Sequence, residues 1–223
     1  MTLLIERLQS SIRDKHLLDH PFYQRWNEGT LTKEELCDYA QQYFHYTMAF
    51  PTFLSATHAN SDDLVVRQAV LENLIEEERG AENHPELWLR FCEALGLDRE
   101  EVRSSTPSEA TTALIGTMKN RARSSTHEGL AALYAYESQV PAVAQAKIDG
   151  LRKFYEIESA RDISFFTVHL EADVLHAKTS EDLLNQLCAD AESQDAAGSS
   201  VAETLDALDG FLDSVNREPA CIN

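Results

Sequence analysis

Along most of this chain, apolar residues recur every three to four positions, which is the spacing of one face of an α-helix. Thr32 and Glu35 form a capping box before one long segment of this kind. Ser61 to Asp63 opens the next segment, which runs towards Gly80. No convincing alternation of strand type is present, and Gly and Pro are few, at 8 and 6 residues. The pattern predicts an all-α protein.

Further helix boundaries are marked by proline and by short polar residues. Pro85 and Ser108 each fit the start of a helix, and Ser125 precedes one that runs to about residue 140. Pro141 is expected to kink or break the path there. We expect about seven to nine helices, in a single bundle over residues 1–215 with a flexible tail at 216–223. The last helices are expected at 159–178, 180–191 and 201–215, with a loop at 191–200.

Charge and cysteine content narrow the class of protein. Lys and Arg number 19 against 38 Asp and Glu, which gives a formal net charge of −19. Such a surface repels phosphate backbones and anionic lipid heads, so we expect no nucleic-acid and no membrane partner. The cysteines are widely spaced without a CxxC pair, which is typical of reduced thiols in a cytoplasmic protein. They are Cys37, Cys92, Cys188 and Cys221.

The sharpest chemical signal is a set of metal-binding side chains on one helix face. His169, Asp173 and His176 are spaced i, i+4 and i+7, so they point the same way. The carboxylate-x-x-histidine pair resembles the ligand pairs of di-iron bundles. A solvated polar face is the alternative, but the apolar residues close to these positions make unpaired polar groups there costly.

Two more segments offer ligands of the same kind. Glu77 and His84 are seven residues apart at the end of a predicted helix, and His84 precedes a proline that places it at a joint between helices. Glu137 is a lone carboxylate among apolar and aromatic residues, where it requires a partner. The alternative for the first pair is an acidic helix end on the surface. The alternative for Glu137 is a buried carboxylate that is hydrogen-bonded to Ser, Tyr or Arg. Imidazole and carboxylate without thiolate favour iron or manganese over structural zinc.

At these positions the chain closely resembles the family of the Chlamydia protein associating with death domains, within the haem-oxygenase-like set that includes thiaminase-like proteins and the C protein of pyrroloquinoline quinone synthesis. The resemblance covers nearly the whole chain. It is carried by short motifs around Tyr23 and Trp26, by Ala49 to Pro51, and by the segments that hold the ligands. It implies a seven-helix haem-oxygenase-like bundle with a di-iron or iron–manganese centre. The implied ligands are Glu77, His84, Glu137, His169, Asp173 and His176.

The resemblance also implies a reaction. It implies synthesis of para-aminobenzoate for folate, with dioxygen and an external electron donor. Tyr23 matches the tyrosine taken as the source of the ring, and Lys147 matches the lysine implicated as amino donor. From sequence alone, Tyr23 reads as a core aromatic and Lys147 as a surface lysine. If Lys147 is the donor, burial near the metal pocket should lower its pKa.

Tyrosine hydroxyls are the last group of candidate site residues. Tyr39, Tyr43, Tyr46 and Phe50 form a stripe at i, i+4, i+7 and i+11, for which core packing is the ordinary interpretation. Because the family places aromatic hydroxyls near its site, Tyr39 and Tyr136 are candidates for electron relay. The remaining histidines have no matching ligand pattern and are assigned no metal role. They are His16, His20, His45, His58 and His127.

Two other functions remain open at this point. A dimetal oxidase could act on an external small molecule, as the pyrroloquinoline quinone relatives do, or the chain could be a metal-free helical adaptor. The chain lacks the cysteine-rich tail of the best-known family member, so host death-domain binding is not carried over. The sequence does not indicate an oligomeric state, although dimers are frequent among relatives of the fold.

Overall fold

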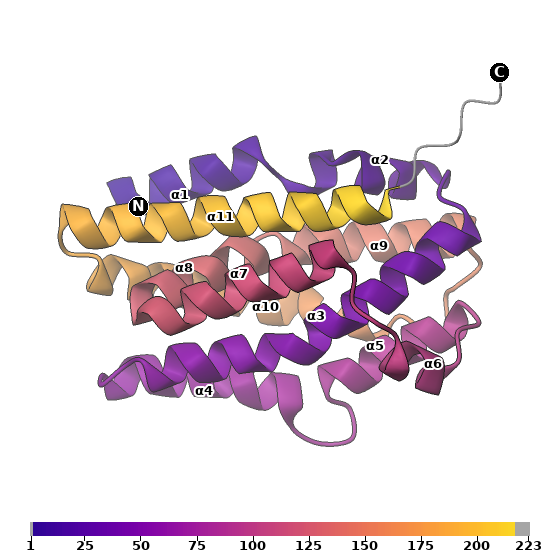
Figure 1. Cartoon of the computed structure of the whole chain (residues 1–223), viewed down its shortest axis with the longest axis horizontal. Coiled ribbons are helices and arrows are strands. Elements are labelled where there is room, and N and C mark those ends of the chain that lie inside the picture. Colours follow the sequence, from indigo (N-terminus) through magenta and orange to yellow (C-terminus); the bar gives the residue numbers. More distant parts are fainter. Residues whose placement is uncertain (1, 217–223) are drawn as a thin grey trace.

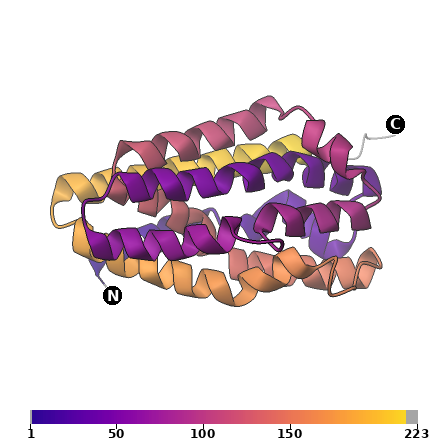
Figure 2. The same cartoon turned by 90° about the horizontal axis from the view of Figure 1, so that it is seen from below.

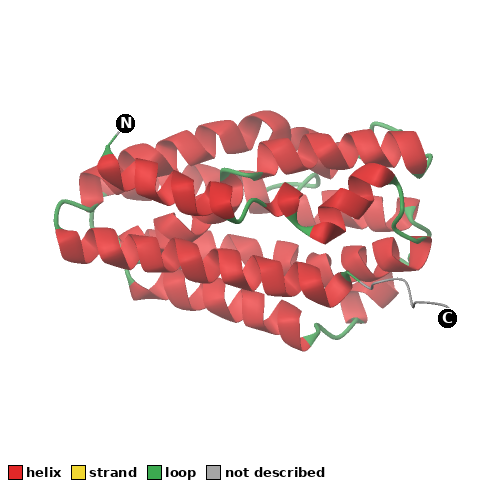
Figure 3. Cartoon of the chain, turned by 90° about the horizontal axis from the view of Figure 1, so that it is seen from above, coloured by secondary structure: helices red, strands yellow, loops and turns green. Residues whose placement is uncertain are grey.

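The chain folds into a bundle whose helices mostly follow one long axis (Figure 1). The computed structural model describes residues 2–216, and these contain helices and no strand (Figure 3). The predicted all-α class is confirmed. The helices are α1 (Leu3–Asp14), the 3₁₀-helix η1 (Leu17–Asp19), α2 (Pro21–Glu28), α3 (Lys33–Ala59), α4 (Leu64–Glu78), α5 (His84–Ala94), α6 (Arg99–Ser104), α7 (Glu109–Ser124), α8 (Thr126–Glu137), α9 (Val140–Phe154), α10 (Ser164–Leu187) and α11 (Ala191–Val215).

Local sequence signals set several of these boundaries. Thr32 accepts a hydrogen bond from the Glu35 backbone N–H, and the Glu35 carboxylate accepts one from Thr32, so the predicted capping box is formed. Helix α8 ends at Glu137 and α9 begins at Val140, with Pro141 in its first turn. The expected break at Pro141 is therefore present, and the proline occupies the first turn of α9, where its missing N–H leaves no helical hydrogen bond unmade.

The C-terminal third differs from the sequence prediction. Residues 191–200, expected to be a loop, are the first turns of α11, and the predicted break near residue 179 is absent because α10 is continuous. Asp190 and Ser193 form a capping box that starts α11. The small side chains that suggested a loop instead allow close packing, since Gly198 lies against the Arg7 side chain and Ala197 is fully buried.

The number of helices is also larger than expected. The short helices α1, α2 and α6 were not among the predicted segments, and their apolar residues are buried in the same core as the long helices. Of the predicted tail, only Asn216 lies within the described residues. Among residues 2–216, Cys37, Cys92 and Cys188 are free thiols, and no helix is long and apolar enough to cross a membrane.

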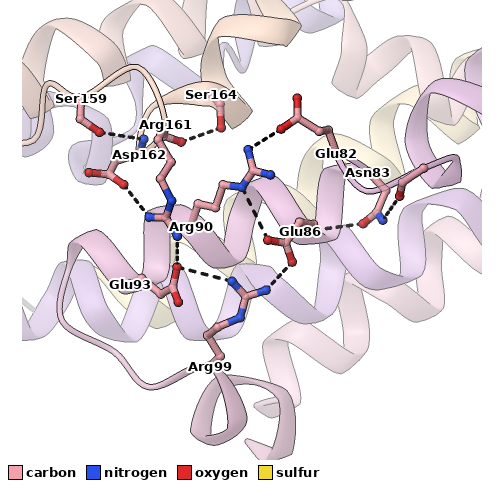
Figure 4. Close-up of polar contacts among 11 residues, drawn as sticks. Glu82, Asn83, Glu86, Arg90, Glu93, Arg99, Ser159, Arg161, Asp162 and Ser164 are labelled. Carbon is pink, nitrogen blue, oxygen red and sulfur yellow. Dashed lines mark hydrogen bonds and ion pairs between the residues drawn. The ribbon is translucent and has the colours of Figure 1, made fainter.

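Helix α10 is central to the arrangement, because it packs along α8 and α9 and also touches α4 and α5. Figure 2 shows α4 running beside α10. A surface network fixes α5 to α6 and to the segment before α10 (Figure 4). In it Arg99 pairs with Glu86 and Glu93, and Arg161 pairs with Glu93. The network joins two of the helices that carry predicted ligands.

Candidate metal centre

The six predicted ligand residues come together in two adjacent groups inside the bundle. Their ligand atoms lie within 4.8 Å of one another in each group. Helix α10 contributes to both groups, α4 and the first residue of α5 complete one, and the last residue of α8 completes the other. The first group is Glu77, His84 and His169, and the second is Glu137, Asp173 and His176.

Helix ends explain how residues on different helices meet. Helix α4 ends one residue after Glu77, and the turn that follows places His84 at the start of α5. His84 Nδ1 then lies 2.8 Å from Glu77 Oε2, although this nitrogen makes no hydrogen bond among the described residues. Burial lowers the pKa of His84, but the adjacent Glu77 carboxylate outweighs this and raises it. A cation shared by the two ligand atoms could take the place of that proton. Asp173 Oδ2 is a second buried atom that has no hydrogen-bond partner within residues 2–216.

Hydrogen bonds orient two of the histidine rings. His169 Nδ1 donates to the Phe165 carbonyl at 2.5 Å, which leaves Nε2 free as a lone-pair donor. His176 Nε2 lies 3.3 Å from Glu76 Oε2, and its Nδ1 faces Asp173 Oδ1 at 3.4 Å. A carboxylate or carbonyl behind a ligand histidine is the usual support at metal sites. Both rings are therefore held as metal ligands require.

The electrostatics of the cluster favour a cation. Burial raises the pKa of the Glu137 carboxyl, and the nearby charge of Asp173 adds to this effect. Burial likewise raises the pKa of Asp173, while it lowers the pKa of His169 to about 3. Burial lowers the pKa of His176, but the Asp173 and Glu137 carboxylates outweigh this and raise it to about 9. A bound cation would take over from that proton and offset the cost of the buried Glu137 and Asp173 charges. A small cavity of about 10 Å³ lies between the groups, lined by Glu77, His169 and Asp173 among others.

A second cavity brings Tyr23 and Lys147 to the same site. It has a volume of about 20 Å³ and is lined by Tyr23, Lys147 and His169, together with Tyr43 and Tyr136. The side chain of Lys147 is buried, and burial lowers the pKa of its amine to about 7. The sequence expectation that Lys147 lies near the pocket with a lowered pKa is therefore met.

Of the two aromatic candidates, Tyr39 contacts Lys147 and Tyr136 lines both small cavities. Lys147 Nζ donates to the Tyr39 hydroxyl at 2.6 Å and lies 5.5 Å from the centre of the Tyr23 ring. The Tyr136 hydroxyl is hydrogen-bonded to that of Tyr43, and both side chains are buried. Tyr136 lines both small cavities, so it stands between the ligand cluster and Tyr23.

Sequence reasoning missed three residues of this site. Asn73 donates from Nδ2 to Glu137 Oε1 at 2.7 Å, and Glu76 supports His176. Asn73 precedes Glu77 by four residues, so helical spacing could have placed it on the ligand face. Tyr43 belongs to the aromatic stripe but was not singled out as a hydroxyl partner. The five histidines left out of the prediction take no part in either group of described residues.

Comparisons with known proteins agree with this geometry. Residues 37–209 match the family described as iron-containing redox enzyme. The chain is 42% identical over 218 residues to a Chlamydia muridarum protein named 4-aminobenzoate synthase, covering 97% of this chain and 92% of the relative. It is 40% identical over 228 residues to a protein of the same name from Nitrosomonas europaea, with 98% and 92% covered. A TenA homologue from Pseudomonas syringae shares the fold, with a TM-score of 0.81, 16% identity, and coverage of 95% and 90%.

Proposed function

The chain belongs to the family of iron-containing redox enzymes, and from this premise we propose that it makes 4-aminobenzoate by an oxygen-dependent reaction at two metal ions. The name shared by relatives at 40–42% identity, one of them outside Chlamydia, supports this activity. The buried donors support the metal centre, because they consist of three carboxylates and three imidazoles. Such donors suit iron or manganese, and we propose an iron–iron or iron–manganese pair.

We propose that each group of three residues holds one ion. When bound and reduced by an external donor, the ions would supply the redox chemistry that activates dioxygen for oxidation of Tyr23. The chain's own residues hold the reactants. Glu76 and the Phe165 carbonyl fix two imidazoles, and Asn73 fixes the Glu137 carboxylate. The closed aromatic walls exclude bulk water from the reaction.

The observation that carries the proposal is that the buried side chains of Tyr23, Lys147 and His169 line one small cavity. At about 20 Å³, this cavity has room for one water-sized molecule and not for an external aromatic substrate. The small volume of this cavity supports a ring that comes from a side chain already in place. Tyr23 is that side chain in our proposal.

The structure of the product supports these two residues. 4-Aminobenzoate has one carbon outside its ring, which Tyr23 provides as Cβ if the Cα–Cβ bond is cleaved. The phenol oxygen must be replaced by nitrogen, and Lys147 Nζ lies 5.5 Å from the centre of the Tyr23 ring. With a pKa of about 7, much of this amine is uncharged at neutral pH and has a free electron pair. Tyr39 orients it through the hydrogen bond to its hydroxyl.

Because Tyr23 is consumed, each protein molecule makes one product molecule in this proposal. The test is mass spectrometry of the metal-loaded protein before and after reductant and oxygen. We expect loss of a tyrosine side chain at Tyr23 with an equal amount of 4-aminobenzoate released. Tyr23→Phe should abolish the product and keep the metal, while Tyr134→Phe, which lies outside the cavity, should leave the product unchanged. Undiminished product from Tyr23→Phe would contradict the proposal.

Isotope labelling separates this proposal from oxidation of an external small molecule. Protein grown with ring-labelled tyrosine should release labelled product in buffer without free tyrosine. Unlabelled product from an added compound would support an external substrate instead. Failure to retain transition metal through purification would favour the metal-free adaptor.

A further inference from the structure

A third space reaches the candidate centre and shares no lining residue with the Tyr23 cavity. It is a pocket of about 220 Å³ between α4, α8 and α10, with Glu137 and His176 in its wall. Figure 2 shows α4 and α10, which flank it, side by side. Most of the remaining wall is aliphatic. The aliphatic residues are Leu54, Val70, Leu130, Leu133, Leu175 and Leu183.

Besides the hydroxyls of Thr179 and Ser180, the polar groups of this pocket gather in two places. Asn73, Glu137 and His176 belong to the ligand cluster and its support. Glu72 and Glu76 are exposed, so they mark the opening towards solvent. These two zones meet where Glu76 Oε2 lies 3.3 Å from His176 Nε2. The aliphatic side chains that form most of the remaining wall offer no hydrogen bond to water. Apolar cavities of about 150 Å³ stay dry and bind benzene or xenon.

A second pocket that reaches the cluster has more charged side chains in its wall. A wider pocket between α1, α8 and α10 reaches Asp173, and its wall includes Arg13, Ser138, Lys178 and Glu181. Such a wall suits water and charged solutes. The Tyr23 cavity is too small to serve as an entrance at about 20 Å³. The aliphatic pocket is therefore the route with the best match to an apolar molecule.

We propose that the aliphatic pocket between α4, α8 and α10 binds small apolar gas molecules and is the path by which dioxygen reaches the centre. The role of dioxygen rests on the proposed function, whereas gas binding does not. This path delivers dioxygen beside Glu137 and His176, neither of which lines the Tyr23 cavity. The separation keeps the entrance apart from the cavity in which Tyr23 and Lys147 are enclosed.

Xenon binding to the metal-free protein tests the pocket without any activity. We expect a crystal held under xenon pressure to show xenon against Leu130 and Leu133. Ala69 is half-buried in the pocket wall, so Ala69→Phe should fill the space and remove the xenon. The matched control is Ala142→Phe, in the polar pocket, which should keep it. No xenon in the wild-type pocket, or equal xenon in Ala69→Phe, would overturn the proposal.

Oxygen kinetics test the path. In stopped-flow mixing of reduced, metal-loaded protein with dissolved oxygen, we expect Ala69→Phe to lower the second-order rate constant about tenfold, which corresponds to about 1.4 kcal/mol in the barrier. Ala142→Phe should react at the wild-type rate. Metal content and thermal midpoint identify a variant that fails to fold or load, and Ala69→Leu then replaces Ala69→Phe.

The two proposals fail in different ways. If Ala69→Phe lacks xenon but consumes oxygen as fast as wild type, this path is wrong, and 4-aminobenzoate released by the wild type still supports the proposed function. A second outcome is that the wild type binds xenon and Ala69→Phe reacts more slowly with oxygen, but the wild type releases no 4-aminobenzoate. In that case the path is supported and the proposed reaction is wrong.

Discussion

Two buried regions of this core, the ligand cluster and the surroundings of Lys147, differ in the charge that they favour. The ligand cluster collects three carboxylates and three imidazoles, and two of its buried atoms make no hydrogen bond within the described residues. The region around Lys147 contains one amine among aromatic rings, and its nitrogen lies within 6 Å of the Tyr23, Tyr39 and Tyr43 ring centres. The carboxylates of the first region favour a bound cation, whereas burial in the second disfavours the charged form of Lys147.

The difference shows how one apolar bundle can prepare two reactants. Burial alone raises the pKa of a carboxyl and lowers that of an amine. In the ligand cluster, this cost is offset when cations bind to the carboxylates. Around Lys147 no carboxylate is among the residues that line the cavity, so the cost is avoided by loss of the proton. Five changes can be measured through protein stability, and the first three test this contrast directly.

Metal loading should have the largest effect. A ligand at 1,000 times its Kd stabilises the folded state by about 4 kcal/mol. For a chain of this size, that corresponds to a rise of about 8–16 °C in the thermal midpoint. Scanning calorimetry with and without iron measures the rise. Asp173→Asn should lose most of it, while His45→Gln, outside the cluster, should keep it. An equal rise in both variants would place the ions elsewhere.

Metal-free Asp173→Asn should also be at least as stable as the metal-free wild type. Burial raises the pKa of Asp173, so its charged form is disfavoured in the folded state when no cation is present. Urea unfolding in a chelator measures this. A clear loss of stability would mean that Asp173 already has a sufficient partner without metal.

Replacement of Lys147 should stabilise the protein. The pKa of Lys147 falls from 10.5 to about 7 on folding. The unfolded chain therefore binds more protons between pH 7 and 10.5, and wild-type stability should rise with pH through this window. We expect Lys147→Met to gain about 3 kcal/mol at pH 7, from a shift worth about 1.4 kcal/mol per pH unit less the lost hydrogen bond.

Urea unfolding from pH 6 to 10 measures both effects. Lys153→Met is the matched control, since Lys153 is an exposed lysine on the same helix. Lys147→Met should lose the rise in stability between pH 7 and 10.5 that the wild type shows. Lys153→Met should keep this rise and should not gain stability at pH 7. If Lys147→Met is destabilised at pH 7, the amine is charged and paired in the folded protein.

A smaller effect is expected where α9 approaches α2. A Cβ atom on Gly150 would lie 2.6 Å from the Trp26 indole, whose Nε1 donates to the Lys147 carbonyl at 3.3 Å. Gly150→Ala should cost about 1–3 kcal/mol through overpacking. Gly210→Ala, in open space on α11, should instead gain up to about 1 kcal/mol from helix propensity. The two variants should therefore move the urea midpoint in opposite directions.

The smallest effect should come from the surface network of Figure 4. Arg99 pairs with Glu86 and Glu93, but its side chain remains 27% exposed. Arg99→Met should cost about 0.5 kcal/mol, and the cost should shrink in 1 M salt. Urea unfolding at both salt concentrations measures it. A cost that does not depend on salt would indicate packing of the side-chain stem rather than ion pairing.

Local sequence signals determined much of the helical framework. The capping box at Thr32 and the break before Pro141 depend on neighbouring residues, so they could be predicted from short segments. The six ligand residues were identified by spacing and resemblance, and the fold brings them within reach of one another. Their role as ligands stays a prediction. Helical period can place such residues on one face, but it does not show what lies opposite that face.

Only the tertiary structure decided the rest. Residues 191–200 are helical because α11 has partners on which small side chains pack closely, and no local pattern reveals those partners. Lys147 looks like a surface lysine in sequence, yet α2 and α3 enclose it among aromatic rings. Glu76 became a support for His176 because α4 lies beside α10. The burial of a side chain and its pKa depend on which distant segments pack against it. Sequence spacing alone does not specify which segments these are.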